Sequence, residues 1–415
     1  MKDPQPNQTR LSRPKPLPRS SDPGRAPAGQ AGRGPGRARP GSNARPGNQS
    51  QADDAGYRCK VKVGSADGIL AVVPHLLGFH PSKSLVVLGI GGPHARIRLA
   101  FRYDLPDPPD ESLSADIAAH AVSVLGREHL TMAILVGYGT GRAVTPVIDT
   151  VQSALGDNQI SIQDALRVDD GRYWSYRCSD PGCCSPDGVP YDLAAHPAAA
   201  ALQAAGLSVH ADRDELAATL AQIPESVEQM AGSLERARGR ATHVIEQALV
   251  LGSDSEGDLF EPVADAGRKS IRQAVMSYRR GREISSYDEM AWLGYVLTDM
   301  RVRDDAWARM DPQYTDAHKL LWTTLLRNLP TEFAPAPAAL LAFVCWQSGD
   351  GALATIAIER ALDADPDYTM ALLIGDALHA GLPPSAARLS MSPKQVAASY
   401  AKHRRPPTPR PNRRT

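Results

Sequence analysis

The segment of residues 67–106, DGILAVVPHLLGFHPSKSLVVLGIGGPHARIRLAFRYDLP, limits the possible folds more than any other part of the chain. Its first apolar residues recur at 69, 70, 72, 73, 76 and 77, which is the spacing of a helix that buries one face. Ser65 or Asp67 can cap the start of this helix, because a short side-chain oxygen accepts a hydrogen bond from an otherwise unpaired backbone amide. Gly78 is typical of a residue that ends a helix in the left-handed conformation.

Two strands follow this helix in the same segment. Residues 84–90, SLVVLGI, are a continuous apolar run and predict a strand that is buried on both faces. Residues 91–93 are a turn signal, and the alternation of apolar and polar residues over 96–105 predicts a half-buried strand. Together the two strands predict a β-hairpin.

The alternation of helices and strands continues beyond this hairpin. We expect helices at 114–125 and 144–155, and strands at 132–137, 161–168 and 172–177. Because a hairpin contributes an antiparallel pair to a sheet that is otherwise built with crossover helices, the sheet should be mixed. We therefore predict an α/β domain with a mixed sheet over residues 57–190.

Helical signals dominate residues 191–390, which we predict to form an all-α domain. Near its end, five residues around a turn at 349–351 have the spacing of a tetratricopeptide-type helix pair. These residues are Leu341, Ala342, Ala354, Ala361 and Pro366. One such pair cannot bury both of its faces alone, so we expect it to pack against the preceding helices in one continuous domain.

Several motifs of the chain resemble a bacterial family that is known as the domain of unknown function DUF4192. The motifs are LGFHP (77–81) with SLVVLG (84–89) and a strand that ends YDLP, DALRVDDGRYWSYRC (164–178), CCSPDG (183–188), DMRVRDDA (299–306) and the segment 340–384. Small departures are His75, where an aromatic residue is expected, and Ser185, where proline is expected. The resemblance covers roughly residues 60–390. It implies a cytosolic bacterial protein of unassigned activity, and it brings no catalytic residues with it.

The two ends of the chain differ from its centre in composition. Residues 1–56 are rich in Pro, Gly, Arg and Ser, and residues 391–415 are basic, so we predict both segments to be disordered tails. Segments 1–56 and 402–415 together carry a formal charge of +12, which leaves −12 on the rest of the chain. Such tails can bind nucleic acid through its phosphates, and the alternative is a purely solubilising role.

The apolar runs of the chain are short. None approaches the roughly 20 residues that a membrane-spanning helix needs. The N-terminal charges are not followed by the hydrophobic segment of a signal peptide. We therefore expect a cytoplasmic protein without a membrane role, whose five cysteines are thiols or metal ligands rather than structural disulfides.

Cys178, Cys183 and Cys184 form the most unusual local pattern of the sequence. Thiolates that lie close in sequence suit zinc, and His196 or Cys59 can complete a set of four ligands. The spacing differs from the usual C-x2-C, and adjacent cysteines rarely bind one ion together. A regulatory disulfide is a second interpretation, and small buried residues that stabilise a loop are a third.

Two polar residues near the first strands are candidates for catalysis. His80 precedes the first strand in the sequence Gly-Phe-His-Pro, where it can act as a general base or instead hold the loop through hydrogen bonds. Asp104 lies on the polar face of the second strand with Arg102. We expect an ion pair between them, and the alternative is that both line a site.

Two further motifs are candidates for ligand binding. GYGTG at 137–141 lies between a strand and a helix, where backbone amides and a helix N-terminus favour an anion, so Tyr138 and Gly139 are candidates. The motif is neither a P-loop nor G-x-G-x-x-G, and a glycine-rich turn required by geometry explains it equally well. Arg172 and Trp174 are further candidates, because an exposed Trp174 can stack on a base or sugar, although a core tryptophan is the alternative.

These features support two hypotheses of function. The first is a non-enzymatic binding protein that uses the helical module and takes an unknown protein partner or small ligand. The second is an enzyme of unknown reaction, with a site at the strand ends near His80 and the three cysteines, and zinc as the one cofactor that the residues suggest. Convergence of His80, Tyr138, Arg172 and the cysteines in one pocket would favour the enzyme.

Overall fold

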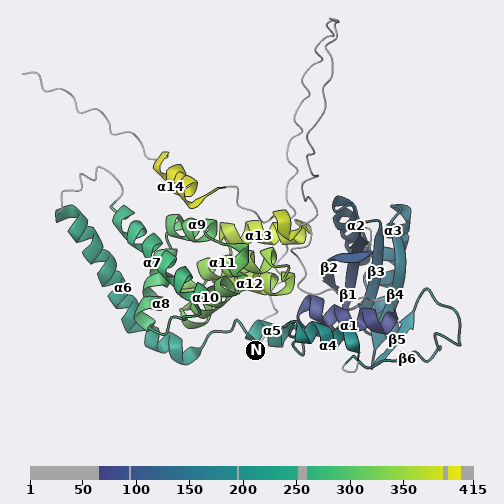
Figure 1. Cartoon of the computed structure of the whole chain (residues 1–415). Coiled ribbons are helices and arrows are strands. Elements are labelled where there is room, and N and C mark those ends of the chain that lie inside the picture. The colour runs from purple at the N-terminus through teal and green to yellow at the C-terminus, as the bar shows by residue number, and fades with distance from the viewer. Residues whose placement is uncertain (1–64, 93–94, 194–195, 251–258, 387–390, 403–415) are drawn as a thin grey trace, which may run out of the picture. The chain divides into compact units, whose positions relative to one another are not determined.

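The structure is a computed structural model that describes residues 65–92, 95–193, 196–250, 259–386 and 391–402 (Figure 1). These residues form an α/β region with a mixed sheet, followed by a series of helices, as the sequence predicted. The predicted tail at 1–56 lies outside the described residues. The domain boundaries at residues 57, 190 and 390 stay predictions.

Helix α1 (Ala66–Leu77) has the ends that the sequence predicted. Ser65 has an extended backbone, and its hydroxyl accepts a hydrogen bond from the amide of Gly68 at 3.2 Å. Gly78 ends the helix with φ of 78°, which a residue with a side chain rarely adopts. The apolar face of α1 packs against the sheet, and so α1 is fixed at both ends and along one side.

The sheet has six strands in the order β2-β1-β3-β4-β5-β6. β1 (Ser84–Gly91) and β2 (Arg96–Asp104) form the predicted antiparallel hairpin. β3 (Met132–Tyr138) is antiparallel to β1 on its other side. β1 is thus paired on both sides, and seven of its eight residues are buried, as its continuous apolar run predicted.

β3 and β4 (Ser161–Asp169) run parallel, and helix α3 (Gly141–Asp157) is the crossover that a parallel pair requires. Asp170 and Gly171 then turn the chain into β5 (Arg172–Ser175), with φ of 45° and 69°. Two consecutive positive φ values are typical of a tight hairpin turn. The two-residue strand β6 (Val189–Pro190) pairs with β5 and was not predicted from the sequence.

The two faces of the sheet bury different helices. α2 (Glu111–Arg127) and α3 pack on one face, against the side chains of β1 and β3 that point to that side. α1 packs on the opposite face. Because side chains alternate along a strand, Leu135 and Gly137 of β3 face α3, whereas Val136 and Tyr138 face α1.

α-Helices dominate the rest of the described chain. They are α4 (Pro197–Ala204), α5 (Arg213–Ala218), α6 (Pro224–Val250), α7 (Glu261–Arg279), α8 (Tyr287–Leu297), α9 (Met300–Ala308), α10 (Thr315–Asn328), α11 (Pro335–Gln347), α12 (Gly351–Ala364), α13 (Thr369–His379) and α14 (Pro393–Lys402). Among the described helices, none is both long enough and apolar enough to cross a membrane.

α11 is the central helix of this series. Every residue from Pro335 to Trp346 is buried, so this helix is apolar on all sides. α11 and α12 form a helix pair across the predicted turn, and the carboxylate of Asp350 caps α12 by accepting a hydrogen bond from the amide of Leu353. The tetratricopeptide character of this pair stays a prediction.

α14 lies within the segment 391–415, for which the sequence predicted a disordered tail. Ser392 and Gln395 explain the helix, because each side chain binds the backbone amide of the other in the manner of a capping box. The hydroxyl of Tyr400 also donates a hydrogen bond to the carboxylate of Asp304 at 2.5 Å. The rest of the predicted tail, residues 403–415, lies outside the described part of the chain.

Candidate functional site at the strand ends

Four strand ends meet at one edge of the sheet. Ser84, the first residue of β1, lies opposite Asp104, the last residue of β2, and also opposite Tyr138, the last residue of β3. Tyr138 in turn lies beside Val168, near the end of β4. The carboxyl ends of β3 and β4 therefore lie at this edge, which is where sheets with parallel strands bind ligands.

A cavity of about 710 Å³ lies at this edge, and we call it the strand-end pocket. It is lined by residues 80–83 and 105–109, by the β3–α3 junction and by the end of β4. Much of its wall is apolar: Pro74, Pro81, Leu105, Pro106, Val168 and Leu193. This size and lining are typical of sites for small organic molecules.

Tyr138 lines this pocket and has a buried, unpaired hydroxyl. Its side chain is 9% exposed, and the structure gives its hydroxyl no hydrogen-bond partner among the described residues. Burial raises the pKa of Tyr138, and the nearby phenol of Tyr191 raises it further. The hydroxyl therefore stays neutral at physiological pH and can donate a hydrogen bond. An unsatisfied buried hydroxyl costs about 1–3 kcal/mol, which a ligand that accepts from it would offset.

Helix α3 begins beside Tyr138. The carbonyl of Thr140 accepts hydrogen bonds from the amides of Ala143 and Val144, both at 3.0 Å. The side chain of Thr140 makes no cap hydrogen bond to the first turn. The amides of Gly141 and Arg142 therefore precede the first intrahelical bonds, and helix termini of this kind favour negative charge.

Glycine is required on each side of Tyr138 for a different geometric reason. A Cβ on Gly137 would lie 2.2 Å from Cγ1 of Val144, so glycine allows β3 and α3 to approach closely. Gly139 has φ of 141°, and its amide donates to the carbonyl of Val168 at 2.8 Å. The geometric interpretation of GYGTG is therefore correct for both glycines, and anion binding at Gly139 stays a prediction.

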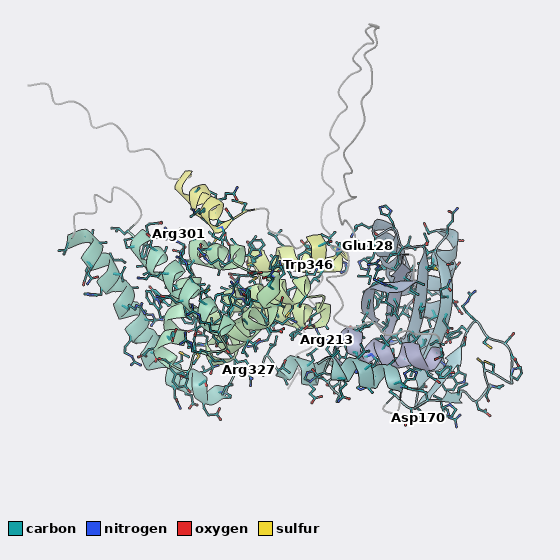
Figure 2. The ribbon with its side chains drawn as sticks, viewed as in Figure 1. Glu128, Asp170, Arg213, Arg301, Arg327 and Trp346 are labelled. Atoms are coloured by element: carbon teal, nitrogen blue, oxygen red, sulfur yellow. The ribbon has the colours of Figure 1, made fainter. Side chains whose placement is uncertain are left out.

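Charged residues of both signs surround the pocket. Lys83 and Arg142 bring positive charge to it, and Asp169 and Asp170 bring negative charge at the end of β4 (Asp170 is labelled in Figure 2). Lys83 has φ of 42°, a left-handed conformation that is costly for a residue with a side chain. Such strain is concentrated at functional sites, and no hairpin turn accounts for it here as one does for Asp170.

The two candidate catalytic residues differ in position. His80 is exposed and lines the strand-end pocket, and its backbone amide donates to the carbonyl of His210 at 3.0 Å. Asp104 is paired with Arg102, and its side chain is 82% exposed at the end of β2. Of the two interpretations for Asp104, the structure thus shows the ion pair.

Arg172 and Trp174 do not line the strand-end pocket, and their side chains bind backbone carbonyls of a neighbouring loop. The guanidinium of Arg172 donates to the carbonyl of Gly188 at 2.9 Å. The indole of Trp174 donates to the carbonyl of Pro186 at 2.9 Å, and the guanidinium carbon of Arg167 lies 3.5 Å from the centroid of its ring. Both residues therefore hold the loop between β5 and β6, and Trp174 is neither a core tryptophan nor an open stacking surface.

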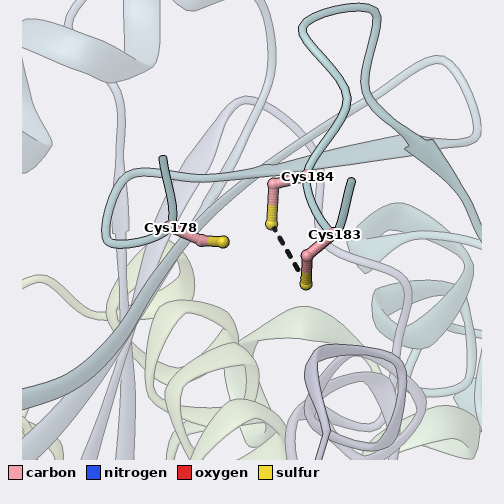
Figure 3. A group of neighbouring side chains, drawn as sticks. All are labelled: Cys178, Cys183 and Cys184. Atoms are coloured by element: carbon pink, nitrogen blue, oxygen red, sulfur yellow. Dashed lines mark hydrogen bonds between the residues drawn. The ribbon is translucent and has the colours of Figure 1, made fainter. Parts of the chain in front are cut away.

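Cys178, Cys183 and Cys184 converge in this loop (Figure 3). Their sulfur atoms all lie within 4.8 Å of one another, and those of Cys183 and Cys184 are 3.9 Å apart. Contact with Cys184 is the main cause that lowers the pKa of Cys178, and the same contact raises the pKa of Cys184. Neither Arg172 nor the cysteines line the strand-end pocket, so of the residues whose convergence would favour an enzyme only His80 and Tyr138 share it.

Comparison with known proteins gives one match. A family model described as domain of unknown function DUF4192 matches residues 67–385, which is most of the chain. The chain belongs to this family. No curated protein and no solved structure matches it. The DUF4192 model spans both the α/β region and the helices up to α13, so the strand-end pocket and the cysteine loop both lie within the family region.

The sequence did not single out three residues of the strand-end pocket. Lys83, Arg142 and Tyr191 all line it, yet none belongs to a motif. A signal for Arg142 was present, because it is the second residue of a helix that starts after a glycine-rich turn. Lys83 and Tyr191 reach the pocket through strand register and through the chain after β6, which the spacing of residues in a sequence does not reveal.

Proposed function

We propose that this protein is a binding protein whose α/β region takes a small organic anion in the strand-end pocket. The observation that carries the proposal is Tyr138, a residue of the pocket wall that is 9% exposed and whose buried hydroxyl has no hydrogen-bond partner among the described residues. Native proteins leave few buried hydroxyls without a partner, and a site for a ligand is one reason to keep one.

The pocket has separate places for the parts of such a ligand. Its anionic group, a phosphate or carboxylate, takes hydrogen bonds from the first amides of α3 and charge from Arg142 and Lys83. Its hydroxyl groups donate to Asp169 or Asp170. Its body packs against the prolines and Tyr191. A phosphorylated sugar or mononucleotide has all three parts.

Thermal unfolding of the full chain with matched pairs of compounds tests this proposal. We expect adenosine 5′-monophosphate or glucose 6-phosphate to raise the unfolding temperature, whereas adenosine, glucose and inorganic phosphate alone have smaller effects. A ligand present at 100 times its dissociation constant stabilises by about 2.7 kcal/mol, which is large enough to measure. Equal shifts from the phosphorylated and neutral members of a pair, or no shift from any member, would contradict the proposal.

Arg142→Gln is the variant that connects this binding to the pocket. It removes one positive charge at the start of α3 while keeping a long polar side chain, so we expect about tenfold weaker binding of the ligand identified above. The matched control is Arg272→Gln, because Arg272 is an exposed arginine on α7 that does not line the pocket. Calorimetric titration should give the same affinity for the control as for the wild type, and an equal loss in both variants would indicate a general charge effect.

A second candidate function is capture of a partner by the helices. A cavity of about 740 Å³ is lined by Trp307, Phe343 and Trp346, with Trp346 labelled in Figure 2. Leu373 also lines it and is 62% exposed. A hydrophobic groove of this kind accepts an apolar segment of a partner. Leu373→Asp should abolish co-purification of a specific partner without changing the ligand-induced shift, and retention of that partner would exclude this groove.

A further inference from the structure

The three cysteines lie in a loop that has little core of its own. Residues 176–188 connect β5 and β6 without a helix or strand, and loops of this length are commonly functional. Most of their side chains are exposed: Cys183 is exposed, and Cys178 and Cys184 are half-buried. The interpretation of these cysteines as small buried residues is therefore wrong, since structural cysteines are packed in a core, as Cys345 is.

Backbone hydrogen bonds shape the inner part of this loop. The carbonyl of Asp180 accepts from the amides of Cys183 at 3.1 Å and Cys184 at 2.7 Å, and its carboxylate accepts from the amide of Gly182 at 2.8 Å. These bonds close a tight turn that brings Cys183 and Cys184 back beside Cys178. The convergence of the sulfur atoms thus follows from the backbone path.

The outer part of the loop is held by β5. Gly188 lies against the indole of Trp174, because a Cβ on this glycine would come within 2.6 Å of the ring. Gly188 has φ of 82°, and Arg172 binds its carbonyl at 2.9 Å. At the other end of the loop, the amide of Tyr176 donates to the carbonyl of Ala165 at 2.8 Å. The loop is therefore anchored at both of its ends, whereas the cysteines between them are not packed in a core, an arrangement that suits a bound metal ion as the remaining source of order.

We propose that Cys178, Cys183 and Cys184 bind one zinc ion through three thiolates, with the fourth coordination position open to solvent. Zinc–sulfur bonds of about 2.3 Å in a tetrahedral site place sulfur atoms about 3.8 Å apart. The separation of Cys183 and Cys184 is 3.9 Å, and all three sulfur atoms lie within 4.8 Å. Small rotations of side chains that are at most half-buried bring the third sulfur to the same distance.

Of the two other ligands that the sequence suggested, His196 already serves as a helix cap. Nδ1 of His196 accepts a hydrogen bond from the amide of Ala198 at 3.1 Å, where it caps helix α4. Cys59 lies outside the described residues. Three protein ligands and an open position are typical of zinc sites that bind a further molecule, whereas structural zinc sites have four protein ligands.

Binding of zinc by the three thiols needs no further reactant. Three S–H groups give their protons to solvent, three S–Zn bonds form, and the resulting site carries a charge of −1. Zinc keeps its oxidation state, so no oxidant or reductant takes part. Uptake of the ion therefore releases protons, which provides a readout that is independent of spectroscopy.

Titration of the reduced, metal-free full chain with Co²⁺ tests this site, because Co²⁺ binds the same thiolate ligands as zinc and absorbs light. We expect saturation at one equivalent, a thiolate-to-metal charge-transfer band, proton release, and displacement of Co²⁺ by Zn²⁺. Cys178→Ser, Cys183→Ser and Cys184→Ser should each lower the band by about a third and weaken binding at least about tenfold.

Two control variants separate this site from general thiol chemistry. Cys345→Ala removes a buried cysteine of α11 that lies outside the cluster and should leave the titration unchanged. Cys59→Ser should also leave the titration unchanged. Loss of metal binding in this variant would show that Cys59 is a fourth ligand and that the fourth coordination position is not open. Three results would contradict the zinc site itself. They are the absence of a saturable band, an equal loss of binding in Cys345→Ala, and a disulfide among the three cysteines without metal in protein that is purified without reductant or chelator.

Discussion

Acidification from pH 6.5 to pH 4 should destabilise this protein by about 3 kcal/mol through His318 alone. His318 lies on α10, is 1% exposed and stacks on Trp322. The structure gives neither of its ring nitrogens a hydrogen-bond partner among the described residues. Burial lowers the pKa of His318 to about 4, the positive charge of Arg279 lowers it as well, and Asp311 opposes the shift.

The direction of this effect follows from the proton balance. Because the unfolded chain holds the proton of His318 below pH 6.5 and the folded protein resists it down to about pH 4, stability is complete above pH 6.5 and falls as the pH falls through this window. His318→Phe keeps a planar ring against Trp322 and removes the titration. Denaturant unfolding across this pH range should show a much smaller loss of stability in the variant, and parallel curves for variant and wild type would contradict the assignment.

Gly137→Ala should destabilise the protein by about 2 kcal/mol, because the added methyl group overpacks the contact between β3 and α3. The new Cβ would lie 2.2 Å from Cγ1 of Val144 and 3.2 Å from Cδ1 of Ile148. Relief of this clash requires α3 to move away from the sheet. Since α3 carries the amides and Arg142 of the strand-end pocket, we also expect weaker ligand binding.

Gly156→Ala is the matched control for this prediction. Gly156 lies in α3, and an added Cβ there would have no atom within 4 Å, so the same substitution should stabilise the protein by about 0.5–1 kcal/mol. Val144→Ala should partly rescue Gly137→Ala, which equilibrium unfolding of the two single variants and the double variant will show as a coupling energy. Equal effects at positions 137 and 156 would contradict close packing as the reason for Gly137.

Local patterns of the sequence predicted most of the α/β region. The helix before Gly78, the buried run of β1 and the alternation of β2 each reflect burial of nearby side chains, which periodicity records. β6 escaped prediction because two residues carry no period and one of them is a proline. α14 escaped because its capping residues are few and the surrounding segment is basic.

Only part of the candidate site could be predicted, because several of its residues are far apart in the sequence. The glycine-rich turn drew attention to Tyr138, since strand, turn and helix are contiguous there. Lys83 is separated from Tyr138 by two strands and a helix, and only the register of β1 against β3 brings them to one pocket. The unpaired hydroxyl of Tyr138 and the burial of His318 result from packing between distant parts of the chain, which the spacing of residues does not reveal.

Tyr138→Phe tests the account of the strand-end pocket most directly, because it removes one hydroxyl and nothing else. The unfolding free energy of the unliganded variant should rise by about 1 kcal/mol, since an unpaired buried hydroxyl is lost, while the stabilisation by the phosphorylated ligand should fall. Both quantities come from one series of denaturant titrations with and without ligand. A variant that is less stable than the wild type and keeps the full ligand effect would contradict the account.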